Sequence, residues 1–303
     1  MVTRKILVID DEKPQAIALA KTIESVIPMS NVLNASAKEE IINYVENKFY
    51  NLAVIDIRMD AYDFNGISLA RRILEINPYA KILFVSKFIP EYLDELTPLL
   101  QNGNVLGFSD KKIDYDEWGE ELKNVILPYY EQLDSNPQSI STALINMYSE
   151  LKDEENTYLK GSRFEDFISL LFQSIGFSEI VKRTRDKSLN EVDLIVRNEI
   201  DDPFLTKFGK YILIECKNHL DTIDKNDFIL FKSKLTATNG LAELGFFITT
   251  SSFKRTAYLE ALRSSEGHHK IVFIDNTLLM RLMKSEDPRE ELKRIIDYQV
   301  KDN

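Results

Sequence analysis

The chain has 303 residues, with 38 Lys and Arg against 49 Asp and Glu, so its formal net charge is −11. Hydrophobic residues make up 44% of the composition and charged residues 29%, which argues against wholesale disorder. No apolar run approaches the roughly 18 residues of a membrane-spanning helix, and the length is typical of two domains.

The start of the chain and its cysteine content bear on the compartment. Acidic residues appear as early as Asp10, so we expect no signal peptide. Cys216 is the single cysteine and cannot form an intramolecular disulfide. With only 3 His, a Cys/His zinc site is not expected either. These features predict a cytoplasmic protein.

The first 130 residues alternate between short apolar runs rich in β-branched residues and stretches of helical periodicity. The runs predict strands at Ile6–Ile9, Val32–Leu33, Leu52–Ile55, Ile82–Val85 and Val105–Phe108. The periodic stretches predict helices at 14–27, 38–48, 66–77, 90–101 and 114–133. Five such units indicate a parallel sheet covered on both faces, with functional residues at the carboxyl ends of its strands.

Three carboxylates follow strands of this half: Asp10 and Asp11 after the first, and Asp56 after the third. In a parallel sheet they converge, and their repulsion calls for a cation, for which Mg²⁺ suits the oxygen ligands. A carboxylate beside Mg²⁺ can act as a nucleophile towards phosphorus. Ser86 ends the fourth strand and Lys111 follows the fifth, where both would contact a phosphoryl group.

These residues give residues 3–130 a resemblance to the receiver domain of two-component response regulators. The motifs that carry it are Ile9-Asp10-Asp11, Asp56-Ile-Arg-Met59, Asn65-Gly66-Ile67, Val85-Ser86 and Gly107-Phe108-x-x-Lys111. The resemblance implies a flavodoxin-like (βα)5 fold in which a sensor histidine kinase phosphorylates Asp56. It further implies that Asp10, Asp11 and Asp56 hold Mg²⁺. By the same resemblance, Ser86, Phe108 and Lys111 form the phosphoryl switch.

Three departures from the receiver pattern concern switching kinetics more than chemistry. Two extra residues lie between Met59 and Gly66, Lys87 replaces a small residue, and Lys112 replaces the proline that favours a cis peptide. One alternative is that these acids only cap a helix or end a strand on a solvated rim. Another is a pseudo-receiver used only for dimerisation.

A connector separates this half from the rest. Ser135-Asn136-Pro137 ends the last helix, and 139–155 has helical periodicity. We therefore predict domains at 1–134 and 159–303 with a helical connector at 135–158. The front domain carries 14 basic and 22 acidic side chains, whereas 160–284 carries 19 basic and 17 acidic, so only the rear is a candidate for binding nucleic acid.

The rear half shows a new α/β pattern. Ser162 and Glu165 have the spacing of a capping box, which predicts that a helix starts after Ser162 and stops at Gly176. The apolar runs that follow predict strands at Glu191–Val196, Tyr211–Lys217, Gly245–Thr249 and Ile271–Ile274. Helices are expected near 225–239 and 254–264.

The most informative segment of this half is the strand Tyr211–Lys217. Its alternation places Glu215 and Lys217 on one face, and a hairpin with the preceding strand would place Asp193 beside Glu215. Two carboxylates can fix a hard divalent ion, which neutralises charge on a phosphodiester and acidifies a bound water. Lys217 would orient the water or help to deprotonate it.

This arrangement resembles the PD-(D/E)xK nuclease core, and within it the Mrr-like restriction endonucleases, over about 158–283. The matching motifs are Gly161-x-x-Phe164-Glu165, Ile175-Gly176-Phe177, Val192-Asp193-Leu-Ile195, Glu215-Cys-Lys217, Phe247-Ile-Thr249-Thr-Ser251 and Val272-Phe-Ile274-Asp275. The resemblance implies hydrolysis of DNA with Mg²⁺ on Asp193 and Glu215. It also implies that Lys217 is catalytic and that Glu165 is an accessory acid.

Two readings without catalysis stand beside this one. Asp193, Glu215 and Lys217 would also suit an exposed hairpin salt bridge, or a degenerate nuclease fold that only binds DNA. The glycines that often flank the first acid in Mrr-like proteins are missing at Asn190-Glu191, so that loop would approach DNA differently.

Basic residues near the predicted site would contact DNA phosphates without reading sequence, although each also suits a solvated charged face. They are Lys182, Arg183, Arg185, Lys254 and Arg255.

Together the halves predict a response regulator with a nuclease output domain. Its expected partners are a sensor histidine kinase, DNA and a second copy of the chain, since one such site cuts one strand; no membrane is expected. The alternative is a phosphorylation-controlled DNA- or protein-binding regulator whose nuclease-like domain is inactive.

Overall fold

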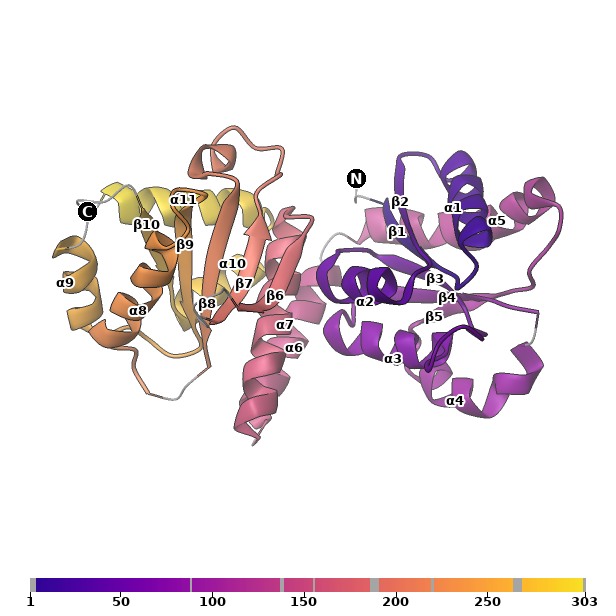
Figure 1. Cartoon of the computed structure of the whole chain (residues 1–303), viewed down its shortest axis with the longest axis horizontal. Helices are drawn as coiled ribbons and strands as arrows, with labels where there is room; N and C mark the ends of the chain where they lie inside the picture. Colours follow the sequence, from indigo (N-terminus) through magenta and orange to yellow (C-terminus); the bar gives the residue numbers. More distant parts are fainter. Residues whose placement is uncertain are drawn as a thin grey trace. The chain divides into compact units, whose positions relative to one another are not determined.

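The structure is a computed structural model of the whole chain (Figure 1). It describes residues 4–87, 89–136, 139–154, 156–185, 191–218, 221–263 and 269–301. The chain divides into two compact units, Met1–Ala143 and Leu144–Asn303. Among the described residues, no helix is both long and apolar enough to cross a membrane.

The first unit is a five-stranded parallel sheet in the order β2-β1-β3-β4-β5. Its strands are β1 (Arg4–Ile9), β2 (Ser30–Ala35), β3 (Leu52–Asp56), β4 (Lys81–Val85) and β5 (Val105–Ser109). Its helices are α1 (Lys13–Val26), α2 (Lys38–Asn47), α3 (Gly66–Ile76), α4 (Leu93–Gln101) and α5 (Tyr115–Ser135), and a short 3₁₀ turn, η1 (Ile89–Tyr92), precedes α4. This confirms the flavodoxin-like arrangement predicted from the alternating pattern.

Apolar side chains from both faces of this sheet explain why the strands read as continuous hydrophobic runs. On one face, buried residues of the sheet pack with residues of α2, α3 and α4. On the other face they pack with residues of α1 and α5, including Trp118, Leu122 and Ile126. Because helices cover both faces of the sheet, functional side chains are expected at the carboxyl ends of its strands.

The second unit is a mixed sheet in the order β10-β9-β8-β7-β6. Its strands are β6 (Ile180–Arg185), β7 (Glu191–Arg197), β8 (Tyr211–Lys217), β9 (Ala242–Thr249) and β10 (Lys270–Ile274). Its helices are α6 (Ser139–Asp153), which spans the division between the units, α7 (Thr157–Ile175), α8 (Lys225–Thr236), α9 (Arg255–Arg263), α10 (Asn276–Lys284) and α11 (Pro288–Lys301), with a 3₁₀ turn η2 (Leu205–Phe208).

The expected hairpin is confirmed: β7 and β8 pair antiparallel, with Leu194 opposite Ile214. Strands β8, β9 and β10 are parallel, so their carboxyl ends meet at one edge. The helices α8 and α9 pack on one face of the sheet through a cluster that includes Leu213, Phe231 and Phe247. On the opposite face, Phe172 of α7 contacts Phe246, with ring centroids 5.1 Å apart.

The capping box predicted at Ser162 is wrong. The helix α7 begins six residues earlier, because the side chain of Asn156 accepts hydrogen bonds from the backbone N–H groups of Tyr158 and Leu159. An Asn cap of this kind satisfies two of the donors that a helix start leaves open. Ser162 and Glu165 are therefore interior positions of a longer helix.

Candidate functional sites

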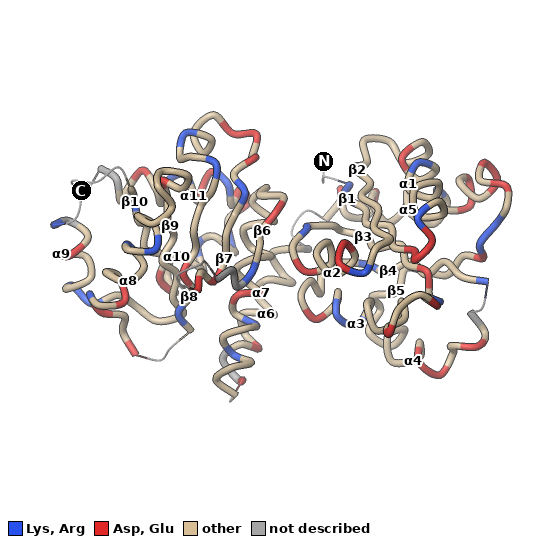
Figure 2. The backbone as a smooth tube through the Cα atoms, in the orientation of Figure 1, with Lys and Arg blue, Asp and Glu red and all other residues tan. Residues whose placement is uncertain are grey.

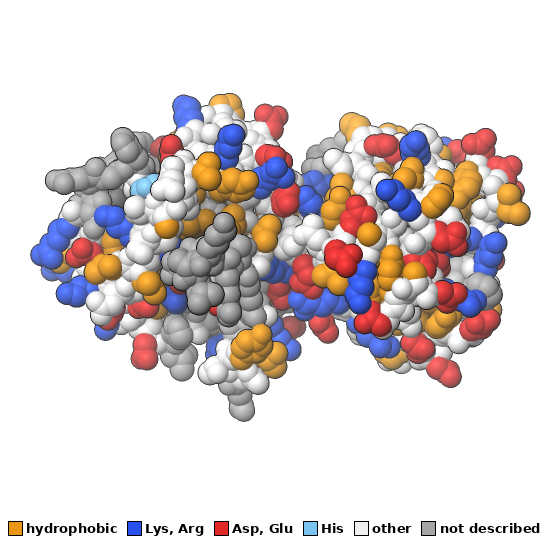
Figure 3. All heavy atoms as spheres, in the orientation of Figure 1, with side chains coloured by type: hydrophobic (Ala, Val, Ile, Leu, Met, Phe, Trp, Pro, Cys, Tyr) orange, Lys and Arg blue, Asp and Glu red, His pale blue; other side chains and the backbone are white. Residues whose placement is uncertain are grey.

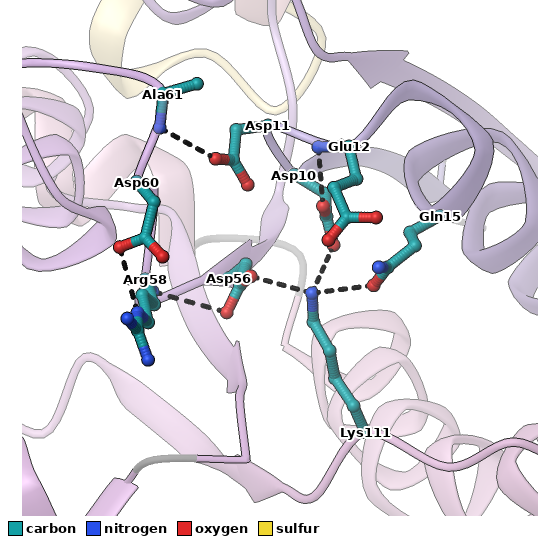
Figure 4. Close-up of polar contacts among 9 residues, drawn as sticks. All are labelled: Asp10, Asp11, Glu12, Gln15, Asp56, Arg58, Asp60, Ala61 and Lys111. Atoms are coloured by element: carbon teal, nitrogen blue, oxygen red, sulfur yellow. Dashed lines mark hydrogen bonds and ion pairs between the residues drawn. The ribbon is translucent and has the colours of Figure 1, made fainter.

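The three acids of the first unit do converge. Asp10 follows β1, Asp11 is the next residue, and Asp56 is the last residue of β3 (Figure 4). One carboxylate oxygen from each lies within 4.8 Å of the others. Figure 2 shows acidic residues along the chain where β1 leads into α1. Three oxygen donors at this spacing fit a hard divalent cation.

Lys111 bridges two of the three acids. Its ammonium group is 2.6 Å from Oδ2 of Asp10, 2.7 Å from Oδ2 of Asp56 and 2.9 Å from the side-chain oxygen of Gln15 (Figure 4). The side chains of Asp10 and Asp56 are 1% and 8% exposed, so solvent screens these contacts little. A lysine that follows β5 thus supplies positive charge that offsets the repulsion between the two buried carboxylates.

Burial and charge act in opposite directions on these groups. Burial raises the pKa of both Asp10 and Asp56, and the hydrogen bonds from Lys111 work against that rise. For Lys111, burial favours the neutral amine, but the hydrogen bonds to the two carboxylates outweigh it and raise its pKa. A cation that binds the acids would offset the same desolvation cost.

Gly66 allows the start of α3 to approach Asp56 closely. A Cβ atom at this residue would lie 2.1 Å from the backbone oxygen of Asp56. Gly66 also donates its N–H to the carbonyl of Ile57 at 2.9 Å, and Asn65 caps α3 by accepting from Ser68 N–H. The start of α3 is thereby fixed directly against the end of β3.

The remaining residues predicted to form a phosphoryl switch lie near the ends of the strands. Ser86 is fully buried after β4, and its N–H donates to the carbonyl of Ser109 at 3.1 Å. Phe108 is half-buried on β5 and stacks on Phe84, with centroids 5.9 Å apart. The indole N–H of Trp118 on α5 donates to the hydroxyl of Ser109 at 2.8 Å, a contact that the sequence did not predict.

The two extra residues after Met59 belong to a loop that reaches back to the acids. The N–H of Ala61 donates to Oδ2 of Asp11 at 3.1 Å (Figure 4). The hydroxyl of Tyr62 donates a short hydrogen bond to the carbonyl of Ser36. The insertion is thus tied to a metal-ligand candidate on one side and to the end of β2 on the other.

In the second unit, the register of β7 and β8 brings Asp193 opposite Glu215. Oδ2 of Asp193 accepts the N–H of Cys216 at 2.7 Å. Glu215 is 3% exposed, and its Oε1 is 3.0 Å from Nζ of Lys217. The acids and the lysine therefore lie together at the carboxyl end of β8, and the two carboxylates are a donor pair that fits a divalent ion.

A second lysine contacts Glu215. Nζ of Lys234, on α8, lies 2.7 Å from Oε2, and its side chain is only 9% exposed. Sequence reasoning missed this residue. The signal that pointed to it was its place on α8 between the buried residues Phe231 and Leu235, which puts it on the side of the helix that faces the sheet.

Burial and the charges around β8 shift the pKa values of neighbouring side chains. Burial, and then the nearby Glu215, raise the pKa of Asp193 to about 6. Burial opposes the charge of Lys217, but Glu215 and Asp193 outweigh it and raise its pKa. Burial and then the carboxylates of Asp193, Glu165 and Glu215 raise the pKa of Cys216 well above its usual range, so its thiol is not an activated nucleophile. Glu165 is thus within electrostatic reach of the same strand.

Polar groups continue from the end of β8 along this edge of the sheet. The side chain of Asn218 donates to the carbonyl of Lys160 at 3.0 Å and accepts the hydroxyl of Thr250 at 2.8 Å. The N–H of Thr250 in turn donates to the carbonyl of Lys217. The carboxyl end of β8 is thereby connected to α7 and to the end of β9.

The basic residues expected to contact DNA differ in their surroundings. Nζ of Lys182 lies 2.6 Å from Oδ1 of Asp166, and both side chains are largely buried, so this ammonium is held inside the unit. Lys254 and Arg255 are exposed, and Figure 3 shows basic side chains over this region around α9. The side chains of Arg183 and Arg185 lie outside the part that the structure describes.

Two family models match the chain. The response regulator receiver domain matches residues 6–115, and a restriction endonuclease model of the Mrr catalytic type matches residues 157–283. A search of curated proteins found no match.

Several solved structures are similar to part of the chain. A CheY-like receiver domain protein from Methanospirillum hungatei JF-1 is 21% identical, with a TM-score of 0.36, covering 43% of this chain and 99% of that one. A two component transcriptional regulator AraC from Clostridium phytofermentans ISDg is 24% identical, with a TM-score of 0.34, covering 44% and 99%. The response regulator protein TrrA from Thermotoga maritima, in complex with Mg(2+)-BeF, is 23% identical, with a TM-score of 0.33, covering 41% and 99%.

Proposed function

Because the chain joins a response regulator receiver domain to an Mrr-type restriction endonuclease domain, we propose that it is a response regulator whose phosphorylation on Asp56 controls a Mg²⁺-dependent nuclease acting on DNA. The observation that carries the proposal is the grouping of Asp193, Glu215 and Lys217 at one strand end, in a chain that also gathers Asp10, Asp11 and Asp56.

Phosphorylation would use the first acidic cluster. A carboxylate oxygen of Asp56 attacks the phosphorus of a phosphohistidine on a sensor kinase, and the bond from phosphorus to nitrogen breaks. Asp10, Asp11 and Asp56 would hold a Mg²⁺ ion, which supplies charge neutralisation on the phosphoryl oxygens. Lys111, already within 2.7 Å of Asp56, is placed to pair with the new phosphoryl group, and Ser86 and Phe108 would respond to it.

Hydrolysis would use the second site. Asp193 and Glu215 would hold Mg²⁺, which supplies Lewis-acid stabilisation of the phosphodiester. Lys217, with its side chain 22% exposed, is placed to orient a water molecule towards phosphorus, and one bond from phosphorus to oxygen breaks as the new one forms. Glu165 would act as an accessory acid, while Lys254 and Arg255 would contact phosphates.

We assign the receiver to residues 1–134, the helical connector to 135–158 and the nuclease domain to 159–303. A homodimer is the form proposed for double-strand cleavage, because one site of this type cuts one strand. We also propose that the chain acts in the cytoplasm and without a membrane partner.

The test is nicking of supercoiled plasmid by the full chain with Mg²⁺, with and without beryllofluoride as a phosphoryl mimic. Lys217→Ala controls for contaminating nuclease. We expect nicking that Lys217→Ala abolishes and that beryllofluoride changes. If the wild type nicks neither methylated nor unmethylated plasmid in either state, the chain is a binding regulator and not a nuclease.

A further inference from the structure

The second lysine on Glu215 has no part in the mechanism above. Glu215 is held between two ammonium groups, Lys217 at Oε1 and Lys234 at Oε2. The two contacts differ in solvent access, since the side chain of Lys217 is 22% exposed and that of Lys234 is 9% exposed. Oε1 is thus bonded by the more exposed lysine, and Oε2 by the buried lysine on α8.

A glycine in the neighbouring strand allows α8 to pack close to the sheet beside Glu215. Gly245 lies on β9 opposite Leu213, two positions before Glu215 along β8. A Cβ atom on Gly245 would lie 2.9 Å from the ring of Phe231 and 3.2 Å from Leu235, both on α8. Because Gly245 has no side chain, α8 packs close against the sheet, and this brings Lys234 within reach of Glu215.

We propose that Lys234 is a positioning residue of the nuclease site, which holds the carboxylate of Glu215 through Oε2 and so sets the orientation in which Glu215 would meet the metal. The inference rests on the proposed nuclease function for its rate effects. The carboxylates Asp193 and Glu215 are balanced in charge by Lys217 and Lys234, so Lys234 also weakens the attraction of the site for a divalent cation. Lys234 thereby lowers the affinity of the site for the metal and holds Glu215 in one defined orientation.

The proposal predicts opposite changes in metal affinity and turnover when Lys234 is replaced by methionine. Without the ammonium the site is more negative and binds a divalent ion about tenfold more tightly. Glu215 is then free to turn or to chelate through both oxygens, and nicking at saturating Mg²⁺ falls at least about tenfold, as expected for a misplaced catalytic group. A purely structural lysine would lower both quantities together.

Metal binding is measured with Mn²⁺ by the spin-resonance signal of the free ion. The full chain carries Asp11→Asn, so that the receiver cluster does not contribute. Lys234→Met should bind Mn²⁺ about tenfold more tightly than its parent. Lys225→Met, which removes the same charge from an exposed position at the start of α8, should bind like the parent.

Nicking is measured without the Asp11 change. Lys234→Met should be slow at saturating Mg²⁺, and Lys234→Arg, which keeps the charge and its donors, should restore most of the rate. Unchanged Mn²⁺ affinity in Lys234→Met, or weaker binding together with a lower melting temperature, would overturn the proposal. If the wild type nicks no plasmid, the nuclease function fails, and the Mn²⁺ titration still decides whether Lys234 tunes the site.

Discussion

At the scale of single residues, both sites place buried carboxylates against lysine. Asp10 and Asp56 share Lys111, and Glu215 is shared by Lys217 and Lys234. A buried carboxylate without a cation is costly, so these lysines stabilise the fold of each site as well as serving its proposed chemistry. The sequence predicted every member except Lys234, because strand alternation ties Lys217 to Glu215, whereas the reach of a helix lysine depends on tertiary packing.

Gly66 gives the first residue-scale prediction. In Gly66→Ala the new methyl group meets the backbone oxygen of Asp56, which lies 2.1 Å from an ideal Cβ. We expect the free energy of unfolding to fall by about 2 kcal/mol and phosphodonor labelling of Asp56 to slow. Urea denaturation and labelling measure these changes. Gly161→Ala is the control, since nothing lies within 4 Å of its Cβ in α7 and alanine favours a helix; equal stability in both variants would contradict the close approach.

Lys182 gives the second prediction, because its ammonium is held by buried Asp166. Lys182→Met removes this ammonium from a buried carboxylate, so we expect a loss of about 3 kcal/mol of unfolding free energy. Lys254→Met, at an exposed position, should weaken plasmid binding and leave stability within about 0.5 kcal/mol. Urea denaturation and gel-shift assays separate the two. If Lys182→Met behaved as Lys254→Met does, Lys182 would be a phosphate contact as the sequence predicted.

At the scale of secondary structure elements, periodicity predicted most strands and helices and failed where other forces decide. The strand β6 was not predicted, because Ile180–Arg185 is largely polar and forms by pairing with β7. The start of α7 was placed too late, because Asn156 and not Ser162 provides the cap. The first error arose because the pairing partner of β6 lies outside the local sequence window. The second arose because two residues competed as the cap of one helix.

The contact between α5 and β5 gives the third prediction. Trp118, the single tryptophan of the chain, donates to the hydroxyl of Ser109, the residue that follows Phe108. If the receiver switches through Phe108, beryllofluoride should alter this hydrogen bond and shift the tryptophan emission by several nanometres. Ser109→Ala, which lacks the acceptor, should shift the emission beforehand and respond less. An emission that beryllofluoride leaves unchanged would place the switch elsewhere than at β5 and α5.

At the scale of the whole molecule, the proposed control of one unit by the other would depend on the segment that joins them. The segment between the two matched regions contains α5 and α6, and α6 packs into the second unit through buried Leu144, Tyr148 and Leu151. The sequence predicted this helix but not its attachment. Attachment depends on side chains that the helix meets only after folding, such as Phe167 of α7 and Asn276 at the start of α10.

Hydrogen bonds connect Tyr148 of α6 towards the proposed nuclease site. Its hydroxyl donates to Oδ1 of Asn276 at 2.6 Å, and the N–H of Asn276 donates to the carbonyl of Ser251. The neighbouring Thr250 bonds the carbonyl of Lys217. Burial raises the pKa of Tyr148 to about 12, so the hydroxyl remains a neutral donor at physiological pH. Through these hydrogen bonds, a movement of α6 would displace residues at the carboxyl end of β8.

Tyr148→Phe tests this coupling by removing only the hydroxyl. We expect the unfolding free energy to fall by about 1 kcal/mol and the response of nicking to beryllofluoride to shrink, while Lys217-dependent nicking persists. Tyr298→Phe is the matched control, because this tyrosine on α11 is 69% exposed and should change neither quantity. A full beryllofluoride response in Tyr148→Phe would mean that the receiver signal reaches the nuclease site by another route, because the hydrogen bond from α6 to Asn276 would then carry no coupling energy.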